Sequence, residues 1–393
     1  MIRRVPGMIT RWWPRSVPRR TTVRVITWAM AGAVVFGALG LVTGAFEPSL
    51  LTRAHRTLVV SDWELYPIHI AWRSDHEFIA LGAYGLGFWF TSGPNPHWDG
   101  YEVDTSTGVR LPLAPFDRLR ESGYQPDPVR WALSPDGEWI LTAIGPADGT
   151  TFSRIIATRL DGGATYKYGV GEATVHVYEP FEHYGYSEYQ CYYAWSPRKG
   201  YWLEWRVLRG RVELVLHRLG RNPATERGFS LAGNPAVVGF LDEAHLLLSD
   251  CKAPAAPREV RLGIAPVGVS GARQWKWHVQ VPLGSVLLDL QLAPTRDRLL
   301  WVFEHRVTPP GPPAIRGLLA KIGWKPYTAI SVWVSMPDGR GFRRIGVQQL
   351  GQDHSKDLSD WNVYDWPGAF AWLPSGRAVS FVWDKRIWTV PTG

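Results

Sequence analysis

The densest set of side chains that could bind a ligand or catalyse a reaction lies in residues 175–193, VHVYEPFEHYGYSEYQCYY. Its glutamates and histidines are side chains that coordinate divalent metals. Their spacing matches no helical motif such as H-E-x-x-H, so we assign no metal site there. Tyrosines that alternate with polar residues are typical of adaptable recognition surfaces. We therefore predict contacts to a ligand or partner at His183, Tyr184, Tyr186 and Glu188, with a solvated acidic connection as the alternative.

A second candidate contact lies in the insertion Tyr84–Gly100, which is rich in aromatic residues, glycine and proline. His97, Trp98 and Asp99 are expected at its tip, where an indole ring could stack on a sugar or hold a peptide. The aromatic run at 88–90 is more simply explained as a buried strand. Trp98 is therefore the candidate that we retain from this insertion.

The sequence carries no recognisable catalytic motif. It lacks a G-x-S-x-G nucleophile elbow, a phosphate-binding Gly-rich loop, a dinucleotide-binding turn and a C-x-x-C pair, so we assign no catalytic, cofactor-binding or metal-ligating residue. A disulfide between the two cysteines, Cys191 and Cys251, stays open because a sequence does not give their Cα separation. A glycan hydrolase or lyase also stays open, because its scattered carboxylates form no motif.

The element that must position these residues is a hairpin, which is clearest at Arg130–Ala143, RWALSPDGEWILTA. Pro135 suits the second position of a turn, and Gly137 tolerates a positive φ. Wide apolar side chains flank the turn on both sides, as expected for two paired strands. The stretch therefore predicts a β-hairpin.

Degenerate copies of this hairpin recur along the chain, beginning at Ala71, Ala194, Gly239, Leu292 and Ala371. A second hairpin follows most copies, with turns at Ser106–Gly108, Asp161–Gly163, Gly220–Asn222 and Met336–Gly339. Each unit is therefore expected to contain four antiparallel strands. About six such units predict an all-β protein, a β-propeller with about six four-stranded blades.

The hairpin S-P-D-G followed by an apolar strand and a D-G turn resembles the TolB-type, WD-repeat-like β-propellers of bacteria. The resemblance covers about Thr57–Gly393 and is strongest at Leu133–Trp139. It implies a fold more than a function, because that family includes binding domains and accessory domains of peptidases. Peptidases of this type carry a separate hydrolase domain after the propeller.

The basic residues are concentrated at the N-terminus. Seven of the 43 Lys and Arg residues lie within residues 1–24, which contain no acidic residue, and the remaining 36 nearly balance the 35 acidic residues. A nucleic-acid-binding domain would carry its positive charge on the folded part. We therefore expect no nucleic-acid partner and interpret residues 1–24 as a basic cytoplasmic tail.

The uncharged segment Val25–Phe46 is expected to cross the lipid bilayer as a signal-anchor helix. Its length corresponds to roughly 33 Å of helix, enough for the hydrocarbon core. Arginines before it predict a single-pass protein of the cytoplasmic membrane, with its N-terminus inside and the propeller on the periplasmic or extracellular side. A cleaved signal peptide ending near Thr43–Ala45 is the alternative.

The remaining division is a tether at 47–55 and a propeller domain at 56–393. The last copy has three strands and lacks a fourth, which Thr57–Val60 could supply to close the ring and remove an exposed edge. The hypothesis that follows is an envelope binding module for a protein or peptide. The alternatives are a scaffold in an envelope complex and a glycan hydrolase or lyase.

Overall fold

The computed structural model describes the chain from Ser49 to Gly393 apart from several gaps. These gaps are residues 60–64, 85–97, 147–153, 170–192, 199, 209–210, 222–227, 234, 252–254, 309–316, 318–320, 322–326, 350–367 and 384–385. The chain divides into two compact units. One comprises Pro48–Thr308 with Pro326–Gly393 and holds all the strands; the other comprises Met1–Glu47 with Pro309–Lys325.

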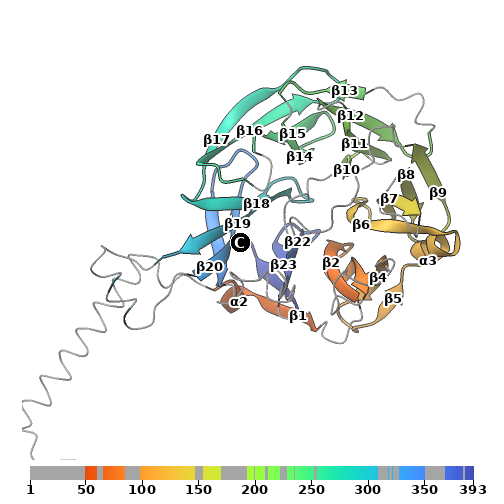
Figure 1. Cartoon of the computed structure of the whole chain (residues 1–393), viewed down its shortest axis with the longest axis horizontal. Helices are drawn as coiled ribbons and strands as arrows, with labels where there is room; N and C mark the ends of the chain where they lie inside the picture. Colours follow the sequence, from red (N-terminus) through yellow and green to blue (C-terminus); the bar gives the residue numbers. More distant parts are fainter. Residues whose placement is uncertain are drawn as a thin grey trace, which may run out of the picture. The chain divides into compact units, whose positions relative to one another are not determined.

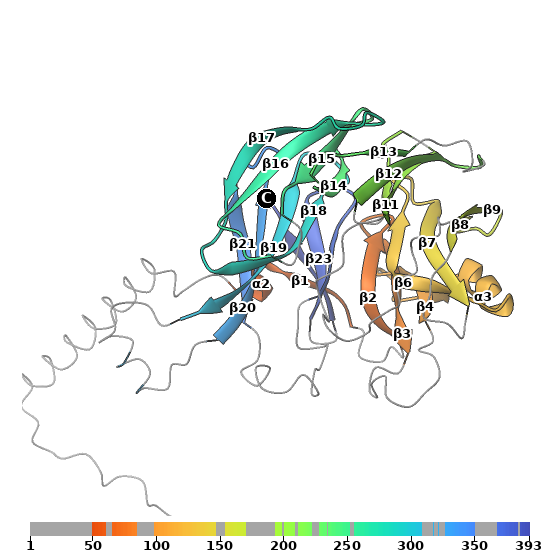
Figure 2. The same cartoon turned by 45° about the horizontal axis from the view of Figure 1, so that its top comes forward.

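Six four-stranded antiparallel sheets form the blades of a β-propeller, which confirms the predicted fold (Figure 1). In five blades the strands pair in chain order, so the first strand of each blade lies innermost around the axis of the ring. Figure 2 shows the later strands of blade 4, β16 and β17, lying outside its first two.

The blades have the following strands. Blade 1 has β2 (Leu65–Trp72), β3 (Glu77–Tyr84), β4 (Trp98–Asp104) and β5 (Arg110–Pro112); blade 2 has β6 (Tyr124–Leu133), β7 (Trp139–Pro146), β8 (Arg154–Arg159) and β9 (Thr165–Gly169). Blade 3 has β10 (Tyr193–Trp195), β11 (Tyr201–Leu208), β12 (Arg211–Arg218) and β13 (Gly228–Ser230); blade 4 has β14 (Ala236–Phe240), β15 (His245–Ser249), β16 (Glu259–Pro266) and β17 (Gln274–Gln280). Blade 5 has β18 (Ser285–Leu292), β19 (Leu299–Val307), β20 (Tyr327–Ser335) and β21 (Arg343–Gln349); blade 6 has β22 (Gly368–Trp372), β23 (Ala378–Trp383), β24 (Arg386–Pro391) and β1 (His55–Val59).

Blade 6 is completed by the N-terminal strand. β1 pairs antiparallel with β24, with Leu58 opposite Ile387, in the sheet order β1-β24-β23-β22. The predicted closure by Thr57–Val60 is therefore confirmed, with the strand placed at His55–Val59. Both ends of the described chain thus lie in one sheet, which leaves no open edge on blade 6 at β24.

The hairpin at Ser134–Trp139 forms as its residue types predict. Gly137 has φ +69°, and its N–H donates to the Ser134 carbonyl over 2.8 Å. The Ser134 hydroxyl donates to Asp136 over 2.5 Å and accepts from the Trp139 N–H over 2.9 Å. The side chains therefore fix the turn that the Pro-Asp-Gly sequence allows.

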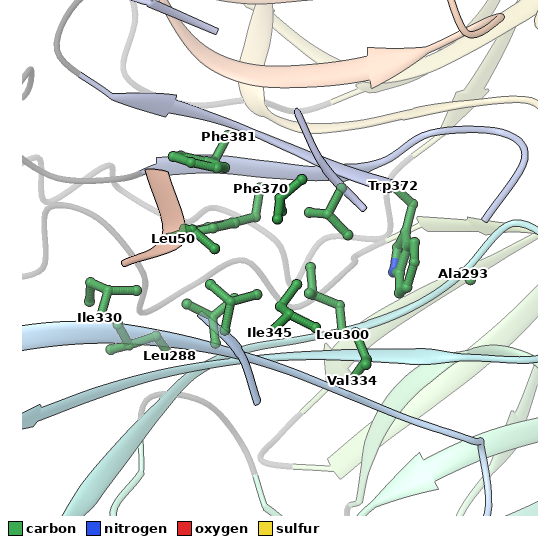
Figure 3. Close-up of a cluster of buried hydrophobic side chains, with 14 residues drawn as sticks. Leu50, Leu288, Ala293, Leu300, Ile330, Val334, Ile345, Phe370, Trp372 and Phe381 are labelled. Carbon is green, nitrogen blue, oxygen red and sulfur yellow. The ribbon is translucent and has the colours of Figure 1, made fainter. Parts of the chain in front are cut away.

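The hydrophobic core lies between neighbouring blades. Leu300, Val302 and Ile330 of blade 5 pack with Phe370 and Trp372 of blade 6 in one buried cluster (Figure 3). Two indole N–H groups also join blades: that of Trp72 donates to Ser380 over 2.7 Å, and that of Trp195 donates to the Ala132 carbonyl over 3.0 Å.

A short N-terminal segment, Ser49–Val59, joins blades 5 and 6, and we call it the clasp. Where the sequence predicts a tether, the structure has the helix α2 (Leu50–Arg53), with Leu50 fully buried in the cluster shown in Figure 3. Ser49 forms a parallel bridge with Val347, and Arg53 donates to the Ile345 carbonyl over 3.1 Å. Removal of the apolar Leu50 side chain from water favours the docking of the clasp against blades 5 and 6.

A second helix that the repeat pattern does not predict, α3 (Ala114–Glu121), connects blades 1 and 2. Phe116 and Leu113 are buried against Ile79 of blade 1 and Ile140 of blade 2. The connection therefore fills the space between two blades.

The predicted membrane-spanning segment Val25–Phe46 lies outside the described residues. Among the helices of the described part, none has the length and hydropathy required to cross a bilayer.

Candidate functional site

The inner half of the ring has two different ends. At one end, which we call the hairpin face, the chain turns from the first strand of each blade into the second. These six turns are short, at residues 73–76, 134–138, 196–200, 241–244, 293–298 and 373–377. The Arg73 side chain would lie 3.4 Å from a Cβ atom at Gly137, and the Thr295 side chain reaches Gly376. The turns of blades 1 and 2 therefore contact one another, as do those of blades 5 and 6.

Hydrogen bonds within the turns fix the conformation of the hairpin face, as the turn of blade 4 illustrates. Asp242 accepts from the Ala244 N–H over 2.7 Å, and the ring of His245 lies 3.0 Å from the same carboxylate. These interactions lower the pKa of Asp242 against the opposing effect of its burial. Arg296, in the turn of blade 5, adopts φ +62°. Its guanidinium group interacts electrostatically with Asp242 in the turn of blade 4.

At the opposite end, which we call the connection face, the second strand of each blade leads to the third, and each blade leads to the next. The connections here include long ones, at residues 85–97, 170–192, 308–326 and 350–367. The strand ends that flank them are described: Tyr84 pairs with Leu65, and Val307 pairs with Tyr327. The ring thus carries short turns on one face and long connections on the other.

Of the predicted contact residues, the structure describes Trp98 alone. Trp98 is the first residue of β4 and pairs with Ala83 of β3, so it begins a strand where the sequence predicts the tip of a loop. His183, Tyr184, Tyr186 and Glu188 lie outside the described residues, between β9 and β10. These four contacts stay predictions.

A polar pair that the sequence analysis misses lies on the inner strand of blade 5. The amide Nε2 of Gln291 donates to Asp289 Oδ2 over 2.6 Å and to the carbonyl of Phe370 in blade 6 over 2.9 Å. A β-bulge between Leu287 and Asp289 precedes the pair; bulges often re-aim side chains in this way. The signal in the sequence is two polar residues, two apart, in the otherwise apolar run VLLDLQL.

Burial changes the acidity of two carboxyl groups in blade 5. Desolvation raises the pKa of Asp289 to about 6, against the smaller opposing effects of hydrogen bonds from Gln291 and the Leu290 N–H. Burial also raises the pKa of Glu304 on β19. Val302 is opposite Asp289 and two residues from Glu304, so the two carboxyl groups belong to the same face of the sheet.

A buried polar cluster lies between blades 2 and 3 but is closed to solvent. His217 Nε2 lies 2.8 Å from Glu204 Oε2, and their side chains are 0% and 3% exposed. The Trp202 ring stacks on His217 with 4.0 Å between ring centroids, and Tyr168 of blade 2 packs edge-on against it. Because no ligand could reach these groups without opening the blades, we interpret the cluster as part of the core.

The described residues contain no group of three His, Cys, Asp or Glu side chains arranged to hold a metal ion. Cys251 is partly buried, and desolvation followed by the charge of Asp250 raises the pKa of its thiol to about 11. A disulfide with Cys191 stays a prediction, because Cys191 lies outside the described residues.

Known proteins resemble this chain at the level of the fold. A protein assigned as TolB from Agrobacterium tumefaciens is 13% identical, with a TM-score of 0.36 over 64% of this chain and 68% of that protein. An oligogalacturonate lyase from Vibrio parahaemolyticus is 10% identical, with a TM-score of 0.43 over 86% of this chain and 97% of the lyase. The predicted resemblance to TolB-type propellers is one of fold, and the propeller arrangement itself is established by the six four-stranded sheets of this chain.

A third similar structure belongs to a prolyl endopeptidase, 14% identical with a TM-score of 0.40. It covers 91% of this chain, but this chain spans about half (51%) of the endopeptidase. No family model matches the sequence. No curated protein matches it either. At these identities the similarity concerns architecture alone, and function must be argued from the chain's own residues.

Proposed function

We propose that this protein is a membrane-anchored, extracytoplasmic β-propeller that binds a protein or peptide partner on its connection face. The observation that carries the proposal is the asymmetry between the two faces. Short, hydrogen-bonded turns form one face, whereas the long connections 85–97, 170–192, 308–326 and 350–367 leave the other. Long connections on a rigid scaffold are where recognition residues concentrate.

The composition of these connections supports a polypeptide partner. Residues 170–192 carry tyrosines among glutamates and histidines, and Trp98 follows directly after residues 85–97. Tyrosine and tryptophan supply large contact areas at a small cost in side-chain entropy, and they are enriched at the centres of protein interfaces.

The apolar segment Val25–Phe46 supports the anchoring. Held by one helix, the propeller would meet partners confined to the same envelope. A fusion of a periplasm-active reporter to Gly393 tests the orientation: activity is expected with the full chain. Activity of the reporter in the cytoplasm instead would overturn the topology.

Site-specific photo-crosslinking in the native host tests the binding face. A photoreactive residue at Trp98 or Tyr186 is expected to yield a discrete cross-linked product with an envelope protein. The matched controls are Glu243 and Ser375, which are exposed in turns of the hairpin face, and no product is expected there. Equal products from both faces, or products from the hairpin face alone, would overturn the proposal.

A propeller glycan hydrolase or lyase is the second candidate. The observation that favours it is the pair of carboxyl groups with raised pKa, Asp289 and Glu304, on one face of blade 5. A protonated carboxyl group is the general acid that such chemistry uses. Release of new glycan ends by the full-length protein, lost in Glu304→Gln, would support this function over binding.

A further inference from the structure

The inner strand of blade 5 holds a carboxylate with no charged partner among the described residues. Asp289 accepts from the Gln291 side-chain amide and from the Leu290 N–H, and both donors are neutral. None of the ion pairs of the described residues includes it. A largely desolvated carboxylate without a cation reduces stability, and proteins carry such a cost mostly at functional sites.

Asp289 is nevertheless partly exposed as a residue, although its carboxyl group is largely desolvated. Residues 289–292 are all partly exposed, whereas Val237–Phe240 of β14 and Phe370–Trp372 of β22 are buried. Because β18 is the innermost strand of its blade and its outer edge is covered by β19, this exposure opens towards the axis of the ring.

The geometry of the pair is fixed. Gln291 uses both amide hydrogens, one on Asp289 and one on the Phe370 carbonyl, so its rotamer is held across the gap between blades 5 and 6. No described residue donates to its carbonyl Oε1, so this oxygen is available as an acceptor near the carboxylate. Two neighbouring acceptors, one of them charged, match a ligand that is positively charged and rich in N–H donors.

We propose that Asp289 and Gln291 form a binding subsite, on the axis between blades 5 and 6, for an organic cation such as an ammonium or guanidinium group. Two oxygen-bearing side chains are too few for a calcium ion, which takes six to eight oxygen ligands. The attraction is strong there, because surrounding protein lowers the effective dielectric constant. The subsite is separate from the connection face, so it does not depend on the proposed partner.

Calorimetric titration of the full-length protein in detergent with methylguanidinium chloride at pH 7.5 tests the subsite. We expect binding with a Kd of about millimolar, as a ligand of few atoms allows. Asp289→Asn should weaken it at least tenfold, whereas Asp297→Asn, a change to an exposed carboxylate in the adjacent turn, should leave it unchanged. Titration at pH 5 should weaken it about tenfold, because most of the carboxyl groups are then protonated.

Tetramethylammonium chloride is the control for charge alone, because it has the same charge and no N–H donor. We expect no saturable binding of this ion. Equal binding of methylguanidinium to wild type and Asp289→Asn, or equal binding of both cations, would overturn the proposal. Melting curves of the two variants establish that each is folded, and failure here would leave the cross-linking result on the connection face unaffected.

Discussion

Leu50 and Gly346 are in such close contact that a Cβ atom at Gly346 would lie 2.8 Å from the Leu50 Cα atom. Leu50 belongs to the clasp, and Gly346 lies on β21 of blade 5. The clasp continues directly into β1, which completes blade 6. The contact therefore links the closure of the ring to the segment that follows the predicted membrane anchor.

Substitution Gly346→Ala should displace the clasp. The added methyl group would meet the backbone of Leu50, and such overpacking costs about 1–3 kcal/mol. We expect a lower melting temperature and faster proteolysis near residue 50. Gly393→Ala is the matched control, because nothing lies within 4 Å of a Cβ atom there, although Arg53 donates to the Gly393 carbonyl. Equal melting temperatures for both variants would contradict the close contact.

Substitution Leu50→Ala tests how much the clasp contributes by burial. Leu50 is fully buried in the cluster between blades 5 and 6, so its truncation should leave a cavity and cost about 2–5 kcal/mol. The midpoint of urea unfolding measures the loss. Leu283→Ala is the control, because that side chain is 85% exposed and its loss should change the midpoint little. If the clasp were a tether that packs against nothing, Leu50→Ala and Leu283→Ala would both change the midpoint little.

The buried Glu204–His217 pair should matter far more than its exposed counterpart. Glu204→Leu removes the carboxylate that pairs with the fully buried imidazole ring of His217. We expect the free energy of unfolding to fall by about 1–3 kcal/mol. The control is Glu259→Leu in the pair of Glu259 with His278, which has a similar 2.9 Å separation but is largely exposed. Pairs of that kind contribute less than about 1 kcal/mol. Similar losses in both variants would refute the assignment of the buried cluster to the core.

Local sequence patterns predict most of the fold. The Pro135 and Gly137 positions define a turn by their φ preferences, so the hairpins and the number of blades follow from residues close in the chain. The missing fourth strand of the last copy predicts the pairing of β1 with β24. The docking of Leu50 does not follow in the same way, because it depends on a cluster whose members come from seven strands, β18 to β24, all distant in the sequence.

The candidate site is predicted less completely. Trp98 is proposed as a contact from its residue type and stays a prediction, whereas its place at the start of β4 depends on pairing with Ala83. Asp289 and Gln291 look like ordinary polar interruptions of a strand. Their importance arises from the carbonyl of Phe370, which is brought next to Gln291 only when blades 5 and 6 come together.

Cys251 should react slowly with iodoacetamide in the folded protein. Burial and the charge of Asp250 raise the pKa of its thiol to about 11, so at pH 8 only about one thiol in a thousand is ionised. We expect labelling at least a hundredfold slower than in urea, followed by mass spectrometry of the peptide that contains Cys251. Rapid labelling of the folded protein would contradict the raised pKa. If Cys251 is labelled in urea only after reduction, the result would instead support a disulfide with Cys191.

Asp289→Asn should stabilise the protein at neutral pH and not at acidic pH. The carboxyl has a pKa of about 6 in the fold and about 3.9 when unfolded, so between these values the folded state binds more protons. The contribution of this carboxyl group to the free energy of unfolding therefore falls as the pH rises from 4 to 6. At pH 7 the group lowers the free energy of unfolding by at most about 3 kcal/mol. Asparagine can still accept from Gln291 and carries no charge. Urea unfolding of wild type and variant should thus diverge from pH 4.5 to pH 7.5, and a difference that is independent of pH would contradict a desolvated carboxylate with no charged partner among the described residues.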